Sequence, residues 1–212
     1  QGVIHGMSSI EEAQRLATLI ESGALPVELK QVEVRTIGAT LGANALERGI
    51  LAGVVGLSLV FLFMLVYYRL PGLVADLALV VYGLLVMLIT VLARITITLP
   101  GIAGIVLSIG MAVDANVIIF ERIKEELRAG KTMRAALDSG FSKAFSAILD
   151  SNVTTLIAGV VLLYFGTGPI QGFAKTLMLG VVVSMFTAIV FTRYVLRLII
   201  DLNIQNKKLY GV

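Results

Sequence analysis

One carboxylate in an apolar run is the strongest candidate for chemistry in this sequence. Asp114 lies in the segment Leu107–Asn116, and the residues on both sides of it are apolar or small. It stands about two helical turns from the polar end of its run, and no Lys or Arg lies within one turn of it. An apolar environment disfavours the ionised form of a carboxyl group, so Asp114 is predicted to bind and release a proton, as a relay does. The alternative is a neutral Asp with a structural hydrogen bond.

An amide follows two residues later on the same segment. Asn116 is predicted to support the relay by orienting a partner or a water, although plain hydrogen bonding between helices explains it equally well. Asp114 and Asn116 flank the two edges of a narrow face that would let another helix approach closely. Both are therefore predicted to lie beside a neighbouring helix rather than to face lipid. The small residues of that face are Gly104, Ser108, Ala112 and Ala115.

Two further polar residues within apolar runs are weaker candidates. Asp76 lies about one turn inside the second run, where a structural or interfacial role explains it better than proton transfer. Asn152 opens the fourth run and is kept as a candidate supporting residue. No nucleophile–base set, phosphate loop or metal-binding set is visible and Cys is absent, so we expect no enzyme, no cofactor and no metal centre. The net charge of +3 is no signal for nucleic acid.

The apolar residues gather in runs long enough to cross a membrane. They make up 58% of the 212 residues, above the roughly 45–50% of a soluble domain, and a bilayer core takes about 20 residues as helix. The fold class is therefore an all-α polytopic membrane protein with a transmembrane domain over 43–212. Five segments fit as spans, of which the fourth is short unless it extends into the helix before it: 49–68, 73–93, 100–120, 152–167 and 172–198.

Basic residues predict how these segments are oriented. They concentrate in the first loop, in 121–150 and after the last span, whereas the opposite loops hold only Arg94 and Lys175. The positive-inside rule places the basic side in the cytoplasm. The N-terminal piece is therefore predicted outside and the C-terminus inside. Pro71 and Gly72 are predicted to make the first cytoplasmic turn, and Pro100 to open the third span.

The polar segments that flank the spans have their own patterns. Residues 9–23 combine a capping box with helical spacing, and 27–35 alternate as a strand does. Residues 1–42 are therefore predicted to be the end of a larger periplasmic α/β domain. Residues 121–150 carry apolar stripes broken at Gly130, which predict two cytoplasmic amphipathic helices. These lie along the inner membrane surface or pack on the inner ends of the bundle.

Several runs resemble the SecD family of protein-export membrane proteins. They are Leu99-Pro-Gly-Ile-Ala-Gly-Ile-Val-Leu107, Ala112-Val-Asp-Ala-Asn-Val-Ile-Ile-Phe-Glu-Arg-Ile-Lys-Glu-Glu126, Asp150-Ser-Asn-Val-Thr-Thr-Leu-Ile157, Gly166-Thr-Gly-Pro-Ile-Gln-Gly-Phe-Ala174 and Ser184-Met-Phe-Thr-Ala188. The family belongs with the resistance-nodulation-division transporters. The resemblance implies the second to sixth spans of a six-helix SecD half. It also implies a proton-motive-force-driven accessory subunit of the Sec export machinery, in the bacterial cytoplasmic membrane.

The resemblance carries expectations about the site and the partners. It implies that Asp114, the Asp of the Val-Asp-Ala-Asn motif, is the membrane carboxylate linked to proton flow. The expected partners are a SecF half, separate or fused, the SecYEG channel, preproteins and the lipid bilayer. Residues of the family's proton path in SecF are outside this chain, so alone it is not expected to drive export. The alternatives are a proton-coupled exporter of small molecules or lipids from the same superfamily, and a scaffold without proton use.

Overall fold

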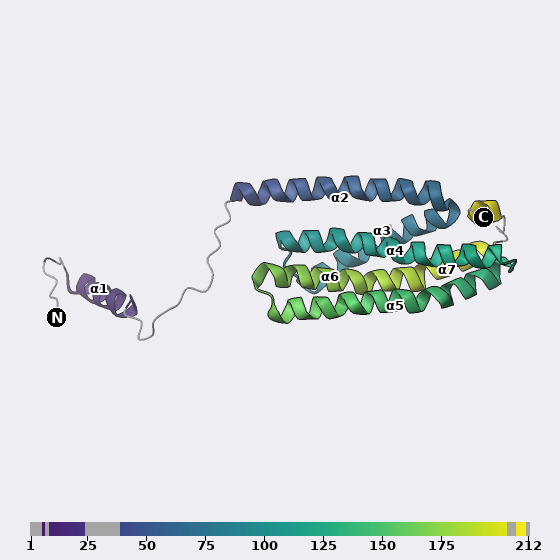
Figure 1. The fold of residues 1–212 in the computed structure, drawn as a ribbon. Coiled ribbons are helices and arrows are strands. Elements are labelled where there is room, and N and C mark those ends of the chain that lie inside the picture. The colour runs from purple at the N-terminus through teal and green to yellow at the C-terminus, as the bar shows by residue number, and fades with distance from the viewer. Residues whose placement is uncertain (1–5, 7–8, 24–38, 203–206, 211–212) are drawn as a thin grey trace. The chain divides into compact units, whose positions relative to one another are not determined.

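The computed structural model describes residues 6, 9–23, 39–202 and 207–210 (Figure 1). The chain divides into two compact units, Gln1–Gly38 and Ala39–Val212. In the first unit the predicted helix is confirmed as α1, Ile10–Gly23. Ser9 caps this helix, because its Oγ accepts a hydrogen bond from the backbone N–H of Glu12 at 3.2 Å. The predicted strand over 27–35 lies outside the described residues.

The second unit is a bundle of long helices. Five segments in it are long and apolar enough to cross a membrane, which confirms the five predicted spans. No strand occurs in the part of the chain that the structure describes. The protein is therefore an all-α, multi-pass membrane protein. The elements of this unit are α2 (Ala39–Tyr68), α3 (Leu70–Leu92), α4 (Leu99–Arg128), α5 (Met133–Phe165), α6 (Gly168–Phe186), the π-helix η1 (Thr187–Thr192), α7 (Arg193–Asp201) and the 3₁₀ turn η2 (Lys207–Tyr210).

Short turns join the helices, and prolines stand in the first turns of α3, α4 and α6. The predicted turn at Pro71 and Gly72 is wrong, because both residues already belong to α3 and the turn is made by Arg69 with φ of 54°. The reason is steric. Gly72 lies so close to the backbone carbonyl of Met64 that no side chain would fit between them, and α3 thus folds back directly on α2. Pro100 opens α4 as predicted.

The two helices predicted over 121–150 do divide at Gly130, but they are continuations of the spans and not separate elements. α4 continues unbroken to Arg128, Gly130 makes the turn with φ of 87°, and α5 begins at Met133. The apolar stripes pack the two helix ends against each other, since a Cβ placed on Gly140 would lie 2.6 Å from Ile123 Cγ1. Burying the stripes in this contact removes them from water. These helix ends form one end of the bundle, as the second alternative predicted, and the short fourth span does extend into the preceding helix.

A large cluster of buried apolar side chains fills this end of the bundle. It draws on α2, α3, α4, α5 and α7, and the C-terminal turn η2 adds Tyr210. In Figure 1 this end lies at the right of the bundle, where the α4–α5 turn and α7 lie. The C-terminal elements α7 and η2 therefore pack on the turn between α4 and α5. Fully buried members of the cluster include Met64, Phe120, Ile148, Leu196 and Ile200.

Charged side chains also link the helices at this end of the bundle. Lys124 is buried, its ammonium lies 4.5 and 4.3 Å from the ring centroids of Tyr67 and Tyr68, and it pairs with Glu121 at 3.2 Å. These contacts compensate a cation that is largely removed from water. Ion pairs also join neighbouring segments: Glu126 with Lys131 and Lys143, Asp138 with Arg193 and Arg197, and Arg134 with Asp201.

The helices differ in how much of their surface the bundle covers. In the most apolar window of Gly168–Asp201, 50% of the residues are buried inside the chain, against 6% for Leu46–Tyr68 of α2. α6 is therefore central, whereas α2 is peripheral. Among its described residues, Met64 and Tyr68 are buried in the core, and Leu57, Val60 and Phe61 pack against it partly buried. The exposed apolar face of α2 suits contact with lipid or with another membrane helix.

Candidate functional site

α4 and α6 approach each other closely along the predicted small-residue face. A Cβ placed on Gly104 would lie 2.5 Å from Thr176 Oγ1 and 3.0 Å from the backbone oxygen of Phe173. The Thr176 hydroxyl donates a hydrogen bond across the interface to the Gly101 carbonyl at 2.9 Å. The predicted close approach of another helix is therefore confirmed, and that helix is α6. We name this contact the α4–α6 seam. The four residues of the face are all buried: Gly104, Ser108, Ala112 and Ala115.

Two buried polar contacts continue along α4 toward the charged end of the bundle. Tyr82 of α3 and Ser108 share a hydrogen bond of 2.6 Å between their hydroxyl oxygens. Further along, the hydroxyl of Thr192 donates to Oδ1 of Asn116 at 2.9 Å, while Nδ2 of Asn116 donates to the Ala112 carbonyl at 3.1 Å. Asn116 thus lies beside another helical segment, as predicted, and its amide oxygen and nitrogen each have a hydrogen-bond partner within the chain.

Thr192 is the functional candidate that sequence reasoning missed. It is fully buried and ends the π-helix η1, which interrupts the helix that α6 and α7 would otherwise form. A π-helical turn changes the angular register of the residues that follow, and such turns are frequent at functional sites. The signal in the sequence was a hydroxyl at the end of the apolar run Ala188–Thr192. That signal is weak, because Thr often bonds to its own helix backbone.

Asp114 lies on the opposite side of α4, exposed on the surface of the chain. It shares this side with Ala103, Leu107 and Gly110, which are also exposed and recur at helical spacing. None of the described residues forms an ion pair or a side-chain hydrogen bond with Asp114. The predicted neighbouring helix for Asp114 is thus not one of the described helices of this chain. We name this exposed stripe of α4, from Ala103 to Asp114, the Asp114 face.

The two weaker candidates lie on helices other than α4. Asp76, on α3, is half-buried, and its Oδ1 is enclosed without a hydrogen-bond partner among the described residues. Asn152, on α5, is buried, and its Nδ2 donates to the Ile148 carbonyl of the same helix at 2.7 Å. Asn152 therefore makes a local backbone contact, whereas Asp76 keeps an unsatisfied oxygen.

Comparison with known proteins places this arrangement in a family. The family model described as "Protein export membrane protein SecD/SecF, C-terminal" matches residues 20–201. The chain belongs to the SecD/SecF family. Its match includes all five candidate spans and both sides of α4. SecD/SecF membership agrees with the resemblance that the Val-Asp-Ala-Asn motif indicated.

Curated SecD relatives align with nearly the whole chain. The protein translocase subunit SecD of Acidaminococcus fermentans is 58% identical over 209 residues, which cover 98% of this chain and 50% of that protein. The protein of the same name from Dictyoglomus turgidum is 54% identical over 213 residues, with 100% and 53% covered. The chain therefore spans about half the length of these curated relatives.

Solved SecDF structures share the fold. A crystal structure of SecDF, described as a translocon-associated membrane protein, from a Thermus species has a TM-score of 0.79 and 46% identity, covering 94% of this chain and 28% of that one. A structure of SecDF in a super-membrane-facing form has a TM-score of 0.74, also at 46% identity, with 93% and 27% covered. The bundle described above is thus the SecD membrane architecture.

Proposed function

We propose that this chain is the membrane part of a SecD-type accessory subunit, which uses the proton gradient to assist export of preproteins, and that Asp114 carries the proton. Family membership and the shared name of the curated relatives, protein translocase subunit SecD, support the export role. The same names do not favour the alternative of a small-molecule or lipid exporter.

The single observation that carries the assignment of Asp114 is its exposure on an otherwise apolar or small-residue face of a membrane helix. A carboxylate near the bilayer centre costs roughly 2.5–3.5 kcal/mol on insertion scales. None of the described residues offsets this cost for Asp114 with a cation or a hydrogen bond. The carboxyl group is then stable in the membrane only when it is protonated or covered by polar groups of another helix. Both conditions suit a proton carrier at an interface.

The SecF half is the partner that we expect to pack on the Asp114 face. We infer that a SecF half packs against Ala103, Gly110 and Asp114, with the small residues allowing close approach of a helix. The opposite side of α4 is joined to α6 by the α4–α6 seam and to η1, which continues α6, by the Asn116–Thr192 hydrogen bond. A change of charge at Asp114 would therefore shift α4 and α6 as one body relative to SecF.

The proton cycle follows from that geometry. Protonation of Asp114 removes a negative charge from the interface and favours closer packing of the SecD and SecF halves. Deprotonation restores the charge and separates them. Binding and release of one proton therefore switches the complex between two arrangements. Movement of the halves would act on the periplasmic domain, on the predicted outer side of the membrane, where it holds or releases an emerging preprotein. The SecYEG channel is the expected source of that preprotein.

The test uses the full-length protein with its SecF half, in vesicles that also hold SecYEG. Completion of preprotein translocation is followed after ATP is exhausted, with and without a proton gradient. Asp114→Asn should abolish the gradient-dependent step while the complex still assembles. Glu125→Gln is the matched control, because it removes an exposed carboxylate of the same helix at its polar end, and it should keep the step.

Three outcomes distinguish the parts of this proposal. Full response of Asp114→Asn to the proton gradient would show that the proton path lies elsewhere. Response of the wild type to a sodium gradient alone would keep Asp114 as the coupling carboxylate but replace the ion. Absence of any gradient effect in the wild type would remove the export role itself.

A further inference from the structure

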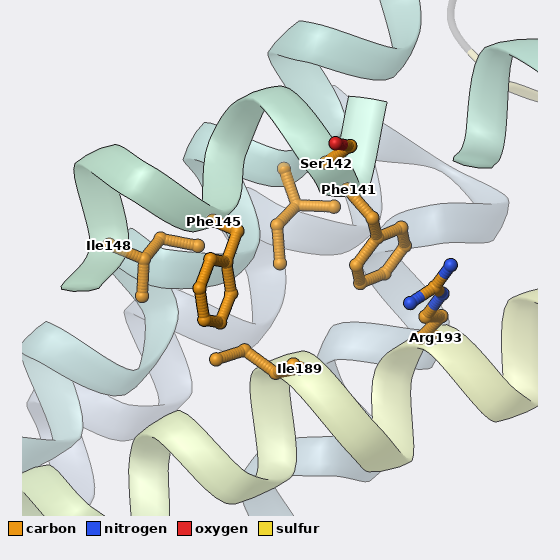
Figure 2. Close-up of a pocket in the computed structure, with 7 residues that line it drawn as sticks. Phe141, Ser142, Phe145, Ile148, Ile189 and Arg193 are labelled. Carbon is orange, nitrogen blue, oxygen red and sulfur yellow. The ribbon is translucent and has the colours of Figure 1, made fainter. Parts of the chain in front are cut away.

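A cavity opens between α5 and the segment formed by η1 and α7, near the charged end of the bundle (Figure 2). Its volume is about 230 Å³. Pockets that enclose a drug-sized ligand measure about 300–1,000 Å³, so this cavity suits one part of a larger molecule. It lies outside the Asp114 face and the α4–α6 seam. Its lining residues are Ile119, Phe141, Ser142, Phe145, Ile148, Ile189 and Arg193.

The lining changes from polar to apolar along the helices. Arg193 and Ser142 stand at the end nearer the α4–α5 turn, whereas Ile148 and Ile189 lie one to two turns deeper in the bundle (Figure 2). The ring of Phe145 is partly exposed beside the two isoleucines. In the last candidate span, Arg193 is the first charged residue after Lys175. The cavity therefore runs from the polar boundary of the membrane into its apolar core, as an amphiphile does.

The polar end of the cavity has more positive than negative charge. Asp138 accepts hydrogen bonds from both Arg193 and Arg197, at 3.1 and 2.7 Å, so one carboxylate serves two guanidinium groups. Nε of Arg193 is buried and has no hydrogen-bond partner among the described residues. Its side chain also lies over the ring of Phe141, 5.7 Å from the centroid. Arg193 is thus held at the cavity, and it shares a single carboxylate with Arg197, so the polar end keeps a positive charge that suits an anion.

We propose that this cavity binds an anionic phospholipid, with part of one acyl chain between Phe145, Ile148 and Ile189 and the phosphate at Arg193 and Ser142. Basic pockets between membrane helices on the cytoplasmic side bind such headgroups, and this end of the bundle is the cytoplasmic one in the proposed orientation. The lipid would fill the gap between α5 and η1.

The test measures lipid retained by the full-length protein with its SecF half. The complex is reconstituted in vesicles of phosphatidylglycerol and phosphatidylcholine, extracted in mild detergent and examined by native mass spectrometry. Arg193→Gln should retain phosphatidylglycerol about fivefold less than the wild type, the factor expected for one basic group at a lipid surface. Arg193→Lys keeps the charge and should retain most of it. Arg122→Gln is the matched control, since it removes an exposed arginine of the same polar end that does not line this cavity.

A second measurement identifies what occupies the apolar end. A photoreactive benzoylphenylalanine in place of Phe145 should form an adduct of phospholipid mass on illumination in these vesicles. An adduct with SecF or another protein would overturn the proposal and make the cavity a subunit contact. Equal retention of phosphatidylglycerol by Arg193→Gln and Arg122→Gln would also overturn it.

Discussion

The α4–α6 seam can be tested with a single methyl group. Gly104→Ala adds a Cβ that would stand 2.5 Å from Thr176 Oγ1 and 3.0 Å from the Phe173 backbone oxygen. The threonine can rotate away, but the backbone oxygen moves only if the two helices separate. Gly83→Ala on α3 is the matched change, because Gly83 is also inside a long helix and a Cβ there meets nothing within 4 Å.

The size of the effect follows from three contributions. Replacing Gly by Ala inside a helix stabilises it by up to about 1 kcal/mol, and this contribution cancels when the two variants are compared. Overpacking at Gly104 costs about 1–3 kcal/mol. Rotation of Thr176 away from Gly101 also removes an interhelical hydrogen bond, worth about 0.6 kcal/mol on average in membrane proteins. Gly104→Ala should therefore be roughly 2–4 kcal/mol less stable than Gly83→Ala.

The assay is thermal stability of the full-length protein with its SecF half in detergent, read as the fraction that remains monodisperse after heating. Gly104→Ala should lose its folded peak several degrees below Gly83→Ala. Gly104→Ala combined with Thr176→Ala should recover part of the difference, because the nearer of the two obstacles is then gone. Equal midpoints for the two glycine variants would refute the close contact between α4 and α6.

Two further predictions concern the two sides of α4. Thr192→Val removes the donor to the buried Oδ1 of Asn116 and should lower the stability by about 1–3 kcal/mol in the same heating assay. Thr192→Ser keeps the hydroxyl and should be nearly as stable as the wild type. An equal loss of stability in both variants would assign the effect to packing instead. Gly110→Leu on the Asp114 face should reduce copurification of the SecF half without lowering the stability of this bundle, while Gly56→Leu, on exposed α2, should not. Unchanged copurification of both would place the interface elsewhere.

The sequence predicted best those features that depend only on residues close together in the chain. A membrane span needs a long run of apolar residues, so the five spans were predictable, and Pro100 opened its helix because a missing N–H is harmless there. The close approach at Gly104 was also predictable, since small residues at helical spacing have few other uses. The turn at Arg69 was not, because it depends on how Gly72 meets the carbonyl of Met64 across the turn.

The same distinction separates the parts of the candidate site. The sequence by itself determined that this is an all-α membrane protein and that Asp114 is a carboxylate without a local cation. Only the tertiary structure decided that Asn116 points inward to Thr192 while Asp114 is exposed on the other side of α4. It also decided that 121–150 prolongs two spans instead of lying on the membrane. The physical reason is that a helical pattern records which residues share a face, whereas the partner of each face is set by distant segments that compete to bury it.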